Sequence, residues 1–199
     1  KLGTGILILP LRNPVVLAKT VASLDRLSRG RLLLGVGVGW VREEAEAAGT
    51  DFNTRGKRCD EYIQAMRALW REPVSSYKGE HVHFERVVSQ PKPAQEAGVP
   101  ILIGGHSPAA ARRAGRLGDG FYPLGVFGEE LDVLLATMRE AAREAGRNPE
   151  EIGVTAVGAP KPALIESLAK QGVERVLISP SSGDLETLAA SLETFQREI

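Results

Sequence analysis

The ten residues Arg31–Trp40, with the sequence RLLLGVGVGW, constrain the fold of this chain more than any other stretch. They begin as a hydrophobic strand and end as alternating glycine and valine. Because side chains alternate between the two faces of a strand, Gly35, Gly37 and Gly39 leave one face bare. Two compatible reasons explain such a strand: a ligand or another backbone comes very close, or the glycines relieve crowding inside a closed barrel. The pattern is not a GxGxxG dinucleotide fingerprint, because Trp40 occupies the position of the third glycine.

Hydrophobic strands and helices alternate along the whole chain in six strand–helix units with one insertion. The six predicted strands are the glycine strand and the segments 2–9, 99–103, 120–124, 152–157 and 175–178. Repeated units of this kind require a parallel sheet with right-handed crossovers. Six units fit either a doubly wound sheet or part of a (β/α)8 barrel, which typically takes about 250 residues.

Capping and breaking residues bound the predicted helices. Asn13-Pro14 begins the first helix and Gly30 stops it, Ser107-Pro108 begins a later one, and Asp184 begins the last. Apolar residues at helical spacing predict the buried faces. In the first helix they are Leu17, Val21, Leu24 and Leu27, and in the helix at 57–71 they are Cys59, Tyr62, Ile63, Met66, Leu69 and Trp70. Residues 74–93 contain turn residues among scattered apolar ones and predict a β-hairpin-like insertion.

Composition excludes several function classes. Lys+Arg and Asp+Glu both number 25, so there is no overall basic field for a nucleic acid. No apolar run approaches the roughly 20 residues of a membrane span, and no signal peptide is visible. The single Cys59 fits a reducing, cytoplasmic setting. The chain begins at Lys1 and enters a strand at once, so we expect the native protein to begin earlier.

Five motifs together resemble the bacterial luciferase-like (β/α)8 superfamily, and most of all its coenzyme F420-dependent oxidoreductase branch. They are GTGILILPLRNPVVLAK at 3–19, LDRLSRGRLLLGVGVGW at 24–40, RGKRCDEYIQAMRALW at 55–70, SQPKPAQ at 89–95 and ILIGGHSPAAARRAGRLGDGF at 101–121. The resemblance implies that residues 1–199 form a single partial barrel, its strands three to eight, with the family's insertion segment at about 74–93. It also implies a homodimer.

The loop Gly104-Gly105-His106-Ser107 is the strongest candidate site that the residues themselves predict. It follows a strand and opens a helix, where free N–H groups and closely approaching glycine backbone bind anions. The plainer alternative is a turn followed by a capping serine. The resemblance implies that this loop holds the phosphate of a deazaflavin or flavin tail.

Two further segments are candidates for cofactor binding. The resemblance implies a bulged strand with a non-prolyl cis peptide at Gly5–Ile6 that supports one face of the cofactor ring, whereas the residues alone predict a core strand. Trp40 ends the glycine strand, where barrel ligands bind, and either lines the ring pocket or packs in the interior. Val38 and Gly39 would bring backbone toward the cofactor.

The other polar and reactive residues have plainer explanations. Arg112, Arg113 and Arg116 either meet an acidic cofactor tail or form a solvated helix face. His81 and His83 share a strand face, but no third ligand is evident and we expect no metal. Asp119 orders a loop or occupies a turn, His106 is an acid/base, a phosphate contact or a bystander, and Cys59 is buried and inert.

The resulting expectation is an F420-dependent oxidoreductase that transfers a hydride between the deazaflavin and a small organic substrate. The catalytic acid/base residue is not identified, and the resemblance places it in strands that precede this sequence. Two alternatives stay open: an FMN-dependent monooxygenase on the same fold, and a non-catalytic flavin-binding or truncated relative.

Overall fold

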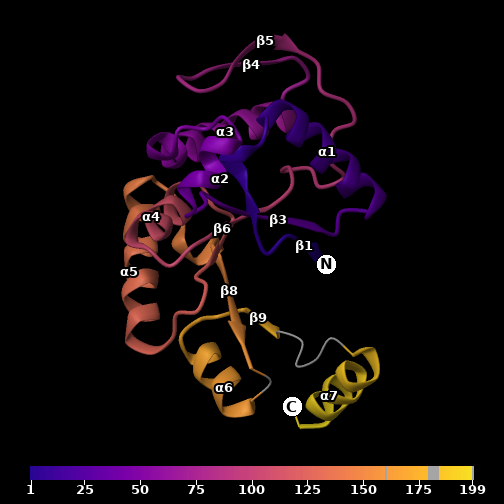
Figure 1. The fold of residues 1–199 in the computed structure, drawn as a ribbon, viewed down its shortest axis with the longest axis vertical. Coiled ribbons are helices and arrows are strands. Elements are labelled where there is room, and N and C mark those ends of the chain that lie inside the picture. Colours follow the sequence, from indigo (N-terminus) through magenta and orange to yellow (C-terminus); the bar gives the residue numbers. More distant parts are fainter. Residues whose placement is uncertain (160, 179–183, 199) are drawn as a thin grey trace.

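The computed structural model describes residues 1–159, 161–178 and 184–198. Its main feature is a parallel, curled sheet in the order β1-β3-β6-β7-β8-β9, with β2 as a second partner of β3 (Figure 1). This confirms the predicted α/β class. The strands are β1 (Leu2–Gly3), β2 (Leu7–Ile8), β3 (Leu32–Gly37), β6 (Ile101–Gly104), β7 (Gly120–Tyr122), β8 (Gly153–Gly158) and β9 (Arg175–Ile178).

A helix follows each of the predicted strands, as the alternation requires. The helices are α1 (Pro14–Leu27), α2 (Arg42–Ala47), α3 (Arg55–Arg71), α4 (Pro108–Leu117), α5 (Gly128–Glu144), α6 (Pro162–Lys170) and α7 (Leu185–Glu198), with short 3-10 turns at Leu9–Leu11, Phe52–Thr54 and Pro149–Glu151. Asn13, Ser107 and Asp184 each accept a hydrogen bond from the first turn of their helix. The predicted starts of these three helices are therefore confirmed.

The buried face of α3 is as predicted, but that of α1 is not. All six apolar residues expected on the face of α3 are buried. In α1, Val21 is buried, whereas Leu24 is exposed and Leu27 is 81% exposed. The face of α1 that packs against α3 and β3 carries small residues. Asp25 also lies on this face and is completely buried. Alanines allow α1 and α3 to approach closely. The buried residues of α1 still follow the helical period, but their face is rotated around the helix relative to the predicted one.

The predicted insertion is an antiparallel hairpin of β4 (Ser75–Lys78) and β5 (His83–Val87). It lies at the top of the view in Figure 1, beyond α3, and does not join the parallel sheet. No helix in the part of the chain that the structure describes is both long and apolar enough to cross a membrane.

Register and burial assign the two faces of the sheet. Val36, Ile103 and Phe121 are buried toward the helices and belong to the core. Gly104 pairs with Tyr122 across β6 and β7, on the opposite, concave face. The hydrophobic core therefore lies between sheet and helices, and the glycines of β3 and β6 face the inside of the curled sheet.

Candidate functional site

A bulge at Thr4-Gly5-Ile6 divides the segment that the residues alone predicted as one strand. The two halves, β1 and β2, pair with the same strand β3. The Thr4 hydroxyl donates a 2.7 Å hydrogen bond to the carbonyl of Gly35, which fixes the bulge against β3. The peptide bond Gly5–Ile6 is cis, as the resemblance implied.

The glycines of β3 and β6 leave room for this bulge. A Cβ atom on Gly35 would overlap the carbonyl oxygen of Thr4, and one on Gly37 would overlap the end of the Ile6 side chain. A Cβ atom on Gly104 would lie 2.9 Å from Cγ2 of Ile6. We call Gly35, Gly37 and Gly104 the glycine socket. It confirms the prediction that another backbone segment comes close to the bare face of β3.

The loop after β6 forms the N-terminus of α4. Gly105 has φ +128°, a value that favours glycine, and its N–H donates to the carbonyl of Tyr122 at 3.2 Å. Ser107 accepts a hydrogen bond from the N–H of Ala110 and so caps α4, while its role at a phosphate stays a prediction. Among the described residues, the N–H groups of His106, Ser107 and Ala109 have no acceptor. The exposed loop thus presents three free donors at a helix N-terminus.

The loop after β3 leaves the same edge of the sheet, because β3 and β6 are adjacent and parallel. Arg55 stacks on the ring of Phe52 at 3.6 Å and donates a hydrogen bond to the carbonyl of Gly39, which has φ +78°. Trp40 is 86% exposed, so the interior-packing alternative is wrong. A role of its exposed indole in a ring pocket stays a prediction.

Sequence reasoning missed Tyr122, the last residue of β7. Its side chain is 6% exposed and reaches across the concave face to the bulge, where a Cβ atom on Gly5 would lie 3.7 Å from its Cε1 atom. The strand has three residues, Gly-Phe-Tyr, which is too short for its alternation to show which aromatic ring faces inward. The only usable signal was the position of Tyr122 at the carboxyl end of a strand.

The arginines of α4 do not form the expected solvated face. Arg113 is buried, forms an ion pair with Asp60 and donates to the carbonyl of Gly56 at 3.1 Å. Arg116 is exposed but pairs with the same carboxylate at 3.0 Å. Arg113 and Arg116 therefore attach α4 to α3, and only Arg112 keeps the predicted solvated position.

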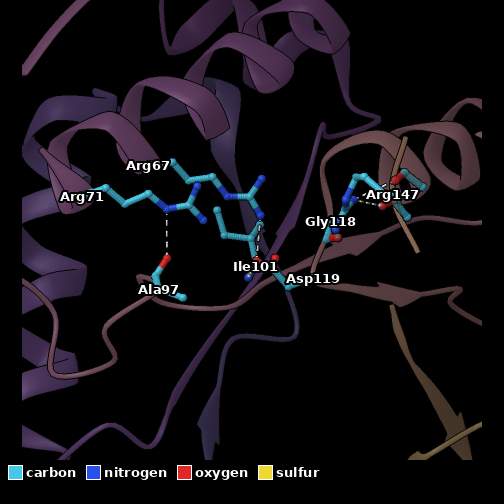
Figure 2. A network of polar contacts seen from close by, with 9 residues as sticks. Arg67, Arg71, Ala97, Ile101, Gly118, Asp119 and Arg147 are labelled. Carbon is cyan, nitrogen blue, oxygen red and sulfur yellow. Dashed lines mark hydrogen bonds and ion pairs between the residues drawn. The ribbon is translucent and has the colours of Figure 1, made fainter. Parts of the chain in front are cut away.

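A second polar network, shown in Figure 2, lies at the opposite edge of the sheet, where β6 and β7 begin. Asp119 accepts hydrogen bonds from the backbone N–H of Ile101 and from Arg67, both at 2.8 Å. Arg147 donates to the carbonyls of Gly115 and Gly118 at 2.7 Å. Asp119 thus orders a loop, as one interpretation predicted, and residues at this edge of a barrel serve stability.

The remaining candidates are His81, His83 and Cys59, and they do not form a common site. His81 lies within 4.8 Å of the carboxylates of Glu61 and Glu80. Glu61, however, already accepts hydrogen bonds from the N–H groups of Glu80 and His81, which explains why these residues gather. His83 is exposed and pairs with Glu85 instead. Cys59 is buried, as predicted, and burial raises the pKa of its thiol to about 12; its low reactivity stays a prediction.

Comparison with known proteins identifies the family. The sequence model described as luciferase-like monooxygenase matches residues 1–195, so the chain belongs to the luciferase-like monooxygenase family. An uncharacterized protein of Mycobacterium tuberculosis is 34% identical over 98% of this chain and 69% of its own length. F420-dependent glucose-6-phosphate dehydrogenase of Mycolicibacterium gilvum is 36% identical over 76% of this chain. The chain spans 47% of that relative.

Solved structures show the same fold. The monooxygenase RslO1 of Streptomyces bottropensis superposes with a TM-score of 0.71 and 27% identity, covering 100% of this chain and 59% of that one. An F420-dependent secondary alcohol dehydrogenase in complex with an F420-acetone adduct superposes with a TM-score of 0.80 and 20% identity, over 94% of this chain and 75% of that one. The curled sheet of this chain is therefore part of a (β/α)8 barrel, as the resemblance implied.

Proposed function

We propose that this protein is an F420-dependent oxidoreductase that transfers a hydride between the deazaflavin and a small organic substrate. The observation that carries the proposal is the pairing of two features at one edge of the sheet. Three free N–H donors at the start of α4 lie next to the strand end that supports the Gly5–Ile6 bulge. The helix N-terminus that would bind an anion thus lies beside the concave face that carries the bulge, as a phosphate-bearing ring cofactor requires.

The residues present fit such a cofactor. The N–H groups of His106, Ser107 and Ala109 would hold the phosphate, with Gly104 and Gly105 allowing close approach of the backbone. Gly5 and Ile6 would support the ring, and Val38, Gly39 and Trp40 would line its pocket. The cofactor supplies the hydride chemistry, while these residues bind it, orient it and exclude water. We include a homodimer in the proposal.

Three lines of support favour F420. Relatives that are 36% identical carry the name F420-dependent glucose-6-phosphate dehydrogenase, the alcohol dehydrogenase of the same fold binds an F420 adduct, and the motifs resemble the F420 branch. The second candidate, an FMN-dependent monooxygenase, is favoured by the likeness to the monooxygenase of Streptomyces bottropensis. The same N–H groups would bind the FMN phosphate, so direct binding of both cofactors decides between them.

A charge placed at the cap of α4 tests the anion site. Ser107→Asp retains a good helix cap, because aspartate accepts the same N–H bond as serine. It also puts a carboxylate where the phosphate is proposed to bind, and we expect F420 to bind roughly 100-fold more weakly. Asn13→Asp is the matched control, since Asn13 caps α1 through the N–H groups of Val15 and Val16 and faces no proposed ligand.

Binding is measured by quenching of F420 fluorescence and, for FMN, of flavin fluorescence. Tight F420 binding that is lost only in Ser107→Asp supports the proposal. FMN binding with oxygen-dependent reoxidation would replace it with the monooxygenase. Equal binding by Ser107→Asp and Asn13→Asp would show that the phosphate lies elsewhere.

A further inference from the structure

The side chain of Tyr122 lies between the two parts of the proposed site. Tyr122 pairs with Gly104 of the glycine socket, and its carbonyl oxygen accepts a hydrogen bond from the N–H of Gly105, in the loop that opens α4. Its phenol ring reaches the bulge, where a Cβ atom on Gly5 would lie 3.8 Å from the hydroxyl oxygen. One residue therefore contacts both the loop that would hold the phosphate and the peptide that would support the ring.

The hydroxyl group of Tyr122 has an unused hydrogen-bonding capacity. Among the described residues it has no hydrogen-bond partner, although the side chain as a whole is 6% exposed. Buried tyrosine hydroxyls usually find a partner. The oxygen is not among the fully enclosed polar atoms without a partner, so it reaches the surface of the concave face. It is placed to donate to a molecule bound there.

We propose that the Tyr122 hydroxyl donates a hydrogen bond to an oxygen or nitrogen acceptor on the ring system of the bound cofactor. This inference rests on the proposed function, since it needs a ring cofactor on the concave face. Burial raises the pKa of Tyr122 above its ordinary value of 10.0. The hydroxyl consequently keeps its proton throughout the physiological range and acts as a donor.

Tyr122→Phe removes the hydroxyl and leaves the ring that packs beside Gly5. We expect F420 to bind about 10-fold more weakly, because the acceptor on the ring is left without its donor. We also expect the absorbance maximum of the bound cofactor at saturation to differ from that in the wild-type complex, since the lost hydrogen bond acted on the chromophore. Tyr77→Phe is the matched control: Tyr77 lies on the hairpin and donates to Gln64 at 3.4 Å.

The thermal unfolding of the ligand-free variants is measured alongside, with the wild-type protein as reference. Weaker binding and a shifted spectrum in Tyr122→Phe only, with unchanged unfolding of the ligand-free protein, support the assignment. Weaker binding with an unchanged spectrum at saturation would make Tyr122 a merely structural residue and overturn it. Wild-type affinity in Tyr122→Phe overturns it as well, while the proposed function stands. If the wild-type protein binds neither F420 nor FMN, the proposed function and this inference are both wrong.

Discussion

Gly35 and Gly37 lie on the same face of β3, but a side chain added at each would meet different atoms. A side chain at Gly35 would overlap backbone of Thr4, which cannot move without breaking the hydrogen bond that fixes the bulge. A side chain at Gly37 would overlap only the far end of Ile6, which can rotate. The bare side of both glycines is therefore filled by the bulge at Thr4-Gly5-Ile6.

We therefore expect Gly35→Ala to destabilise the protein by about 3 kcal/mol and Gly37→Ala by about 1 kcal/mol, in the range of overpacked cores. Gly3→Ala is the control, because its Cβ atom would meet the nearest atoms at 3.6 Å, an ordinary contact. Urea denaturation monitored by circular dichroism measures all three. Equal losses for Gly35→Ala and Gly37→Ala would contradict the distinction between backbone and side-chain neighbours.

Because Cys59 is buried, we expect the stability of the folded protein to fall at alkaline pH. In the unfolded chain its thiol ionises near the ordinary pKa of 9.0, whereas in the folded chain burial raises the pKa to about 12. Between these pH values the unfolded state binds fewer protons, so this contribution to stability is complete below pH 9 and is lost as pH rises. Cys59→Ala should lack this loss, of up to about 1.4 kcal/mol per pH unit.

Denaturation of wild type and Cys59→Ala at several alkaline pH values isolates the effect from other titrating groups. As a second readout, the native thiol should react with a thiol reagent at pH 8 far more slowly than the denatured one. Labelling of the native protein at the denatured rate would show that the side chain is accessible.

At the scale of elements, periodicity predicted α3 completely and α1 only in part. The large apolar residues of α3 occupy one stripe, so the strongest signal is also the buried face. In α1 the buried residues are Pro14, Ala18, Val21, Ala22 and Asp25, while Leu24 and Leu27 are exposed. A carboxylate buried by its partners cannot be recognised from helical spacing, because those partners come from a segment distant in sequence.

Asp25 connects α1 to the segment that returns from the hairpin. Its carboxylate accepts hydrogen bonds from the N–H groups of Ala94 and Gln95 and from the amide of Gln95, at 2.8–3.0 Å. Asp25→Asn replaces one carboxylate oxygen by an NH2 group that faces other donors. We expect the free energy of unfolding to fall by about 3 kcal/mol. Hydrogen exchange at residues 94–95 should increase in the same variant. Glu144→Gln on an exposed helix position is the control.

For the candidate site, the sequence predicted the loop that opens α4 at Gly104–Ser107 and not the tyrosine beside it. The glycines and the capping serine follow one another in the chain, so local rules were sufficient for Gly104–Ser107. The bulge at Gly5–Ile6 came from the resemblance, since a short glycine-containing strand has no local mark of a bulge. Tyr122 meets Gly5 only through the arrangement of the sheet, which the sequence shows in outline but not in register.

At the scale of the whole molecule, a bound cofactor should stabilise the fold by mass action. The proposed contacts come from the bulge before β2, from the segments that follow β3 and β6, and from the end of β7, so the ligand would join distant parts of the chain. At 100 times the dissociation constant the gain is about 2.7 kcal/mol, which corresponds to a rise of about 5–10 °C in Tm for a chain of this size. Calorimetry with and without F420 measures it, and Ser107→Asp should show no rise under the same conditions.

The Ile6 side chain packs against Gly37 and Gly104, and this contact should affect how the sequence of this chain evolves. One side chain limits what two other positions can carry, so a smaller residue 6 would relax the constraint on Gly37 and part of the constraint on Gly104, which also lies close to the carbonyl of Val36. Across relatives these three positions should change together, and Ile6→Ala should restore part of the stability lost in Gly37→Ala in a double-mutant cycle. The substitutions that Gly37 of β3 tolerates thus depend on a residue in the bulge between β1 and β2.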